Sequence, residues 1–196
     1  MGMATTNRSL ICEVPVFFAT SEGQTRVIAR RIVSVLHDLG LESCAIDVAG
    51  PNAADIDWAH VRGAIVGASI HIGKHQKAAE RFVKARAVDL TSVPSAFFSV
   101  SLSAASKNAK EVEAAEKLAK AFPTACGWVP ARIVSVAGRL AYREYGFFIR
   151  WVIKQIAKKE GAPTDTSRDY ELTNWEEVDA LARDMAKRIH VRTAVA

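Results

Sequence analysis

Residues 20–25 combine hydroxyl, amide and glycine residues in a pattern typical of a phosphate site. They follow an apolar run at residues 14–19, and apolar side chains at helical spacing begin again at Val27. A turn between a strand and a helix leaves the first N–H groups of the helix free to point at an anion, and the helix dipole favours negative charge there. The candidate phosphate-binding residues are Thr20, Ser21, Glu22, Gly23, Gln24 and Thr25, with the Glu22 carboxylate expected to face solvent.

This turn lacks two common nucleotide-binding motifs. It has neither Gly-x-x-x-x-Gly-Lys-Ser/Thr, which holds triphosphates, nor Gly-x-Gly-x-x-Gly, which holds dinucleotides. A single phosphate monoester held by hydroxyls and backbone amides fits these residues better. The hexapeptide resembles the flavodoxin loop that holds the phosphate of flavin mononucleotide (FMN). An ordinary capped helix start is the alternative interpretation, because the hexapeptide by itself fits both.

Two later polar segments have the chemistry to hold a flavin ring. Small and hydroxyl residues let backbone groups reach the polar edge of the ring, and an isoleucine can cover its apolar face. The spacing of His71 and His75 is also that of a metal pair, but no carboxylate or cysteine nearby completes a site, so no metal is predicted. The candidate ring-binding residues are Ser69, Ile70, His71, Ile72 and Gly73 in one segment and Ser101, Leu102 and Ser103 in the other.

The elements that must position these segments alternate between strand and helix. Apolar runs predict strands at residues 14–19, 42–48, 61–68, 94–100 and 131–137, and helical spacing predicts helices at 27–39, 74–88, 109–121 and 174–189. This alternation indicates an α/β fold, a flavodoxin-like doubly wound parallel sheet with strand order 2-1-3-4-5. Ligands of such sheets bind beyond the carboxyl ends of the strands, where the three polar segments lie.

Length, composition and charge fit a single domain. The 196 residues are 49% hydrophobic and carry a net charge of +5, which favours an acidic ligand or an anionic surface. Residues 1–12 are expected to be a disordered leader, residues 13–190 the domain and residues 191–196 a tail. No stretch of about 18 apolar residues occurs. The three cysteines, Cys12, Cys44 and Cys126, form no CxxC motif and are expected to be reduced apolar fillers of an intracellular chain.

A basic insertion separates the last predicted strand from the last helix. It covers residues 139–168, where a minimal flavodoxin has a short connection. Residues 139–160 contain six Lys or Arg and two Glu. Apolar residues fall at helical spacing, and basic residues occupy the opposite face. Packing on the domain, contact with an anionic membrane and binding of a flat carboxylate-bearing molecule are all compatible with this amphipathic pattern.

The joint order of several short motifs is specific. Four motifs follow one another along the chain in an order that recurs in one flavodoxin-like family. They are Ala-Ser-Ile-x-x-Gly at residues 68–73, Pro-Ser-Ala-Phe-Phe-Ser-Val at 94–100, Thr-Asp-Thr at 164–166 and Thr-Asn-Trp-Glu-Glu-Val at 173–178. In this the chain resembles the quinone-dependent protoporphyrinogen IX dehydrogenases of bacterial haem biosynthesis. The resemblance extends from about residue 14 to about residue 189 and includes the insertion.

The resemblance implies an activity and its partners. It implies FMN as cofactor, protoporphyrinogen IX as substrate and menaquinone or ubiquinone as electron acceptor. It also implies a cytoplasmic protein held peripherally at the inner face of the cell membrane by an anionic surface. No nucleic acid is expected, a homo-oligomer is left open, and no side chain is singled out as a catalytic acid or base. The candidates for substrate carboxylates or lipid headgroups are Arg139, Arg143, Arg150 and Lys154.

Three other functions are compatible with the same fold. A flavodoxin electron carrier usually has an acidic surface, which the basic balance of this chain disfavours. A flavodoxin-like NAD(P)H:quinone reductase would need no second nucleotide site if the nicotinamide stacked directly on the flavin. A flavin-free scaffold is the third, since fold alone does not fix function.

Overall fold

One main sheet organises the chain, in a computed structural model that describes residues 10–53, 55–140 and 170–195. Its parallel strands are β1 (Val14–Ala19), β2 (Ser43–Asp47), β3 (Ala64–His71), β5 (Ser95–Ser101) and β6 (Arg132–Ala137), in the order β2-β1-β3-β5-β6. The predicted order is confirmed. The numbering differs because a two-residue strand, β4 (Lys74–His75), pairs antiparallel with the end of β3.

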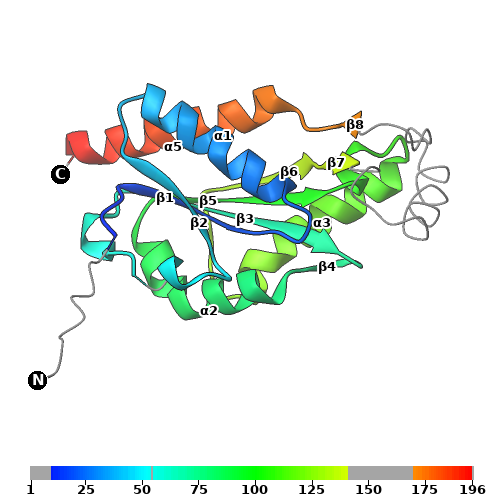
Figure 1. Cartoon of the computed structure of the whole chain (residues 1–196), viewed down its shortest axis with the longest axis horizontal. Helices are drawn as coiled ribbons and strands as arrows, with labels where there is room; N and C mark the ends of the chain where they lie inside the picture. The colour runs from blue at the N-terminus through cyan, green and yellow to red at the C-terminus, as the bar shows by residue number, and fades with distance from the viewer. Residues whose placement is uncertain (1–9, 54, 141–169, 196) are drawn as a thin grey trace, which may run out of the picture.

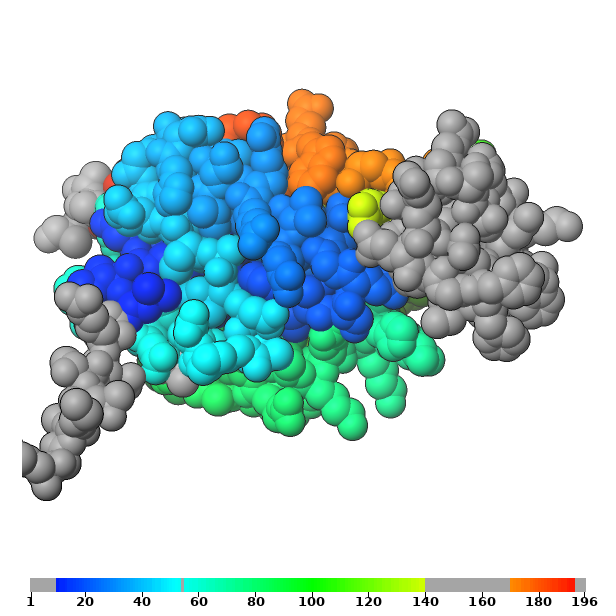
Figure 2. Space-filling model, in the orientation of Figure 1, coloured from blue at the N-terminus to red at the C-terminus, as the bar shows by residue number. Residues whose placement is uncertain are grey.

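Within the described residues, helices cover both faces of the sheet (Figure 1). Helices α1 (Gln24–Asp38) and α5 (Trp175–Val195) lie on one face, and α2 (Lys77–Ser92) and α3 (Ala109–Ala125) lie on the other. Short 3-10 turns occupy Pro51–Ala53, Trp58–His60 and Ser103–Ala105. A second, two-stranded antiparallel sheet joins β7 (Arg139–Leu140) to β8 (Tyr170–Glu171). Figure 2 shows α1 and the residues around β2 forming one face of the molecule.

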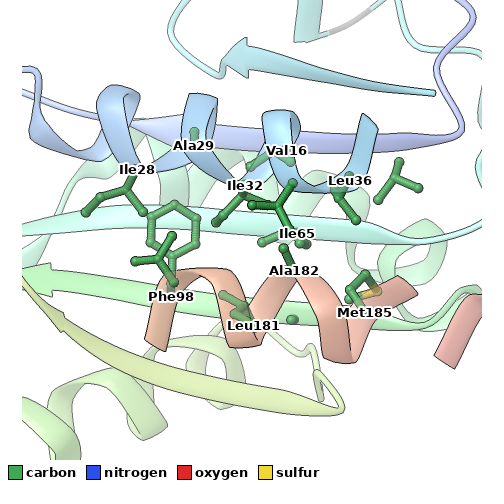
Figure 3. Close-up of a cluster of buried hydrophobic side chains, with 14 of the residues drawn as sticks. Val16, Ile28, Ala29, Ile32, Leu36, Ile65, Phe98, Leu181, Ala182 and Met185 are labelled. Carbon is green, nitrogen blue, oxygen red and sulfur yellow. The ribbon is translucent and has the colours of Figure 1, made fainter. Parts of the chain in front are cut away.

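The alternation of side chains along the strands builds two apolar layers. Successive residues of a strand point to opposite faces, so Val16 and Phe18 of β1 contribute to one layer and Phe17 to the other. In the first layer, Ile28, Ile32 and Leu36 from α1 meet Leu181, Ala182 and Met185 from α5 over β3 and β5 (Figure 3). Burial of both layers fixes the sheet, and the sheet in turn fixes where its carboxyl-end loops lie.

The ends of two helices agree with the sequence signals that predicted them. Helix α1 stops before Gly40, whose φ of 77° is left-handed, and the N–H of Gly40 donates to the carbonyl of His37. Asn174 precedes α5, and its Oδ1 accepts a hydrogen bond from the N–H of Glu177 at 3.3 Å. Helix α5 continues six residues beyond the predicted end at Ile189, through Val195.

The amino-terminal boundary and the cysteines differ from expectation. Leu10 forms a bridge with Ile56, and Cys12 is buried, so structured chain begins before residue 13. A disulfide joins Cys12, two residues before β1, to Cys44 in β2, and their Cα atoms lie 6.3 Å apart. The expectation of three reduced cysteines was therefore wrong for these two. Cys126 is unpaired and buried, as expected.

Replacement of Gly67 by alanine is expected to lower the free energy of unfolding by about 2 kcal/mol. Gly67 lies in β3, and a methyl group there would overlap the ring of Phe98, which is fully buried in the neighbouring strand. The matched control is Gly138→Ala, whose methyl would lie an ordinary 3.4 Å from Val100. Urea denaturation of both variants measures the difference. Equal stability of the two would contradict the close contact between Gly67 and the ring.

Candidate functional site

The three predicted binding segments begin at the carboxyl ends of β1, β3 and β5, at one edge of the sheet. The loop after β1, the β3–β4 hairpin and the β7–β8 pair lie at the same end of the molecule (Figure 1). Such an edge is where doubly wound sheets bind their ligands, because the strand order changes direction between β1 and β3.

The loop at residues 20–25 has the geometry of an anion site. Gly23, the N-cap of α1, has a φ of 86°, and its N–H donates to Thr20 Oγ1 at 2.9 Å. The first backbone bond of the helix runs from the Val27 N–H to the Gly23 carbonyl, so the N–H groups of residues 24–26 precede the helical ladder. A Cβ built on Gly23 meets no atom of the described residues within 4 Å. Glu22 is exposed, in line with its expected orientation toward solvent.

Thr25 carries an unsatisfied hydroxyl into this turn. The residue is fully buried in the first turn of α1, and its Oγ1 has no hydrogen-bond partner among the described residues. An unsatisfied buried hydroxyl costs roughly 1–3 kcal/mol, so such groups call for an explanation. A phosphate bound at the helix terminus would supply the missing acceptor. The residues present therefore fit a phosphate monoester.

Gln76 joins the first and second binding segments. Its side-chain amide donates to Ser21 Oγ and to Ser69 Oγ, each at 2.8 Å. Both serines act as acceptors here, which leaves their hydroxyl protons free to donate to a ligand. No local pattern predicts this role, because Gln76 precedes α2 and lies 55 residues from Ser21.

Gln24 points away from the predicted ligand. Its amide is buried and donates to the Glu171 carboxylate, at 3.1 and 3.2 Å to the two oxygens, and to Thr173 Oγ1 at 3.0 Å. Thr173 Oγ1 donates in turn to the carbonyl of Ala137 at the end of β6. The Gln24 side chain therefore anchors the phosphate loop to β8, while its backbone N–H stays with the helix start.

The second binding segment is a hairpin, and it was expected to be a loop. Ser69, Ile70 and His71 belong to β3, because Ile70 pairs with His75 and His71 with Lys74. Ile72 and Gly73 form the tip, both with positive φ, of 48° and 69°. Ile72 is 88% exposed. Its left-handed backbone conformation is unusual for a β-branched residue. The hairpin presents this apolar side chain beside the phosphate loop, where it can cover a ring.

The third binding segment continues β5 into a short turn. Ser101 is the last residue of β5, and its Oγ accepts a hydrogen bond from the N–H of Ala104 at 3.2 Å. Leu102 and Ser103 follow, at the start of the 3-10 turn, and both are half-buried. These residues stand beyond the carboxyl end of β5, next to the strand that carries Ser69.

The two histidines of the β3–β4 hairpin, His71 and His75, have different surroundings. His71 is exposed at the end of β3. His75 lies against the rings of Phe97 and Phe122, and its Nε2 is 2.9 Å from Ser99 Oγ. Burial lowers the pKa of His75 from 6.5 to about 4. The described residues contain no group of three metal-ligating side chains. They also contain no helix long and apolar enough to cross a membrane.

The predicted substrate residues fall largely outside the described chain. Arg139 begins β7 and pairs in register with Glu171 of β8. Arg143, Arg150 and Lys154 lie in residues 141–169, outside the described residues. Their role and that of the insertion stay predictions.

Comparison with known proteins identifies the family. The model of the flavodoxin domain matches residues 15–167. A protoporphyrinogen IX dehydrogenase [quinone] from Escherichia coli K12 is 37% identical over 172 residues, which cover 87% of this chain and 93% of that protein. The chain belongs to this dehydrogenase family. A second protoporphyrinogen IX dehydrogenase [quinone], from Leishmania major, is 32% identical over 86% of this chain and 72% of its own length.

The solved structures agree on the fold of this dehydrogenase family member. Oxidised flavodoxin 1 from Bacillus cereus superposes with a TM-score of 0.53 at 17% sequence identity, over 89% of this chain and 97% of the flavodoxin. The flavodoxin-like prediction is confirmed. Membership of the flavodoxin-domain family supports flavin binding.

Proposed function

We propose that the protein binds FMN and oxidises protoporphyrinogen IX to protoporphyrin IX, with a membrane quinone as electron acceptor. The observation that carries the proposal is the phosphate loop, whose Thr25 hydroxyl has no hydrogen-bond partner within the described residues, in a member of the dehydrogenase family. A loop of hydroxyls and free amides without lysine suits a monoester phosphate such as that of FMN.

In the proposed cofactor site, different segments contact the phosphate and the ring of FMN. The Ser21 and Thr25 hydroxyls and the N–H groups of residues 24–26 hold the phosphate. Ile72 covers one side of the ring, and backbone groups near Ser69 and Ser101 reach its polar edge. Gln76 holds the first two segments in register. Bound FMN supplies the two-electron chemistry that links the porphyrinogen to the quinone.

The proposed location follows from the charge of the chain. Basic residues of the insertion, including Arg139, Arg143, Arg150 and Lys154, contact anionic headgroups at the cytoplasmic face of the cell membrane. A basic residue near an anionic leaflet contributes about 1 kcal/mol, so several together hold a protein reversibly. Menaquinone and ubiquinone, which are membrane-soluble, are then within reach.

An anaerobic assay tests the proposed activity. Purified protein is loaded with FMN and given protoporphyrinogen IX with and without a soluble ubiquinone or menaquinone analogue. We expect porphyrin fluorescence to rise only when both protein and quinone are present, because the electrons need an acceptor.

A parallel reaction replaces the porphyrinogen with NADH or NADPH. Rapid flavin reduction by either nicotinamide, together with no porphyrin formation, would replace the proposed function with a quinone reductase. Protein that fails to bind FMN at all would leave only a scaffold of the same fold.

A further inference from the structure

A groove beside the proposed flavin site has both an apolar floor and a cationic edge. It lies between the β3–β4 hairpin with the start of α2 on one side and α3 on the other, and it has a volume of about 820 Å³. This size is within the range of ligand pockets, roughly 300–1,000 Å³. Ser21 of the phosphate loop and the hairpin tip at residues 71–74 also line the groove, so a molecule in it would adjoin the cofactor loops.

The floor of the groove is apolar. Leu118, Ala121, Phe122 and Ala125 line it from α3, and Ile72 lines it from the hairpin tip. Leu118 and Ile72 are 36% and 88% exposed, so large apolar side chains face open space on both sides. A flat apolar ligand would cover this surface, which costs free energy while it is in contact with water.

The edge of the groove carries more positive than negative charge. Lys74 and Lys77 are exposed at its rim, and neither forms a salt bridge within the described residues. The one carboxylate in the described lining, Glu80, forms an ion pair with Lys84 at 2.6 Å. Its pKa is lowered chiefly by Lys84 and to a lesser extent by Lys77 and Lys74, so one carboxylate faces both lysines of the groove. Lys77 is the first residue of α2 and Lys74 lies three residues before it, at the end of the helix where the dipole favours an anion. Apolar floor and cationic rim together complement an apolar molecule that bears carboxylates.

We infer that this groove binds the porphyrinogen, with its carboxylates at Lys74 and Lys77 and its macrocycle edge over Leu118 and Phe122. The inference rests on the proposed function, which supplies an apolar tetrapyrrole with carboxylate side chains. It assigns substrate recognition to the hairpin and α3. A neutral quinone has no anionic group to pair with the two lysines, so charge complementarity favours the porphyrinogen as the ligand.

Two groove variants and one control test the inference. Lys74→Gln with Lys77→Gln removes the charges, and Ala121→Glu places a carboxylate on the exposed floor, where the fold tolerates it. The control, Arg30→Gln with Lys187→Gln, removes two exposed cations that do not line the groove. Each protein is assayed for the KM of protoporphyrinogen IX, the KM of the quinone and the Kd of FMN. Binding of protoporphyrin IX and of its dimethyl ester is measured by fluorescence.

We expect both groove variants to raise the porphyrinogen KM and the protoporphyrin IX Kd roughly tenfold or more. The FMN Kd, the quinone KM and ester binding to the lysine variant should stay at wild-type values, and the control should match wild type throughout. Unchanged porphyrinogen KM in both groove variants would overturn the inference, as would a rise in the quinone KM instead. Wild-type protein that forms no porphyrin would refute the proposed function, a result distinct from either.

Discussion

Valine in place of Thr25 is expected to weaken FMN binding roughly 10- to 100-fold and to leave the fold intact. A hydrogen bond to a charged group contributes about 1.5–3 kcal/mol, and 1.4 kcal/mol corresponds to a factor of ten in Kd. Valine keeps the shape of threonine in this fully buried position and removes only the hydroxyl. Because that hydroxyl has no partner within the described protein, its loss should not lower the stability of the FMN-free protein and should raise it slightly. Fluorescence titration with FMN and urea denaturation measure the two effects.

Ser135→Ala is the matched control for the Thr25 variant. Ser135 Oγ in β6 is also buried without a hydrogen-bond partner in the described chain, but it does not belong to the phosphate loop. Its replacement should change stability in the same direction and leave the FMN Kd unchanged. Wild-type FMN affinity in the Thr25 variant would show that the hydroxyl is not a phosphate ligand. Equal weakening in both variants would show a general effect on the fold.

The sheet was predictable from the sequence because its strands are buried on both faces. Such strands read as short continuous apolar runs, and β1 was placed at its observed bounds, Val14–Ala19. The polar loop at residues 20–25 was also visible as a turn between a strand and a helix. Its role in phosphate binding stays a prediction, because the same residues fit an ordinary capped helix start. These two features fixed the edge of the sheet at which the site lies.

The contacts that hold the site together were not predictable from local sequence. The β3–β4 hairpin depends on two polar residues, Lys74 and His75, that carry no strand signal. Gln76 and Gln24 act across 55 and 147 residues, and no periodicity reports such long-range hydrogen bonds. The Cys12–Cys44 disulfide joins a residue just before β1 to a residue of β2, a proximity that the 32-residue separation of the cysteines does not reveal.

His75 is expected to make the protein about 3 kcal/mol less stable near pH 4 than near neutral pH. Burial lowers the folded-state pKa to about 4, whereas the unfolded chain titrates near 6.5. Above pH 6.5 both states hold the neutral imidazole, and no proton difference exists. As the pH falls from 6.5 to 4, the unfolded chain gains a proton that the folded protein does not accept. The free energy of unfolding therefore falls over this pH window. Below about pH 4 both states are protonated and the loss levels off.

The comparison of His75→Gln with wild type isolates this contribution. Glutamine does not titrate, and its amide retains the capacity to bond Ser99. Urea denaturation between about pH 7 and about pH 4.5 should therefore show a smaller loss of stability in the variant than in wild type. His190→Gln removes an exposed histidine from α5 and should keep the wild-type pH profile. Parallel profiles for wild type and His75→Gln would mean that the imidazole takes up its proton in the folded protein as readily as in the unfolded chain, which its contacts with Phe97 and Phe122 should prevent.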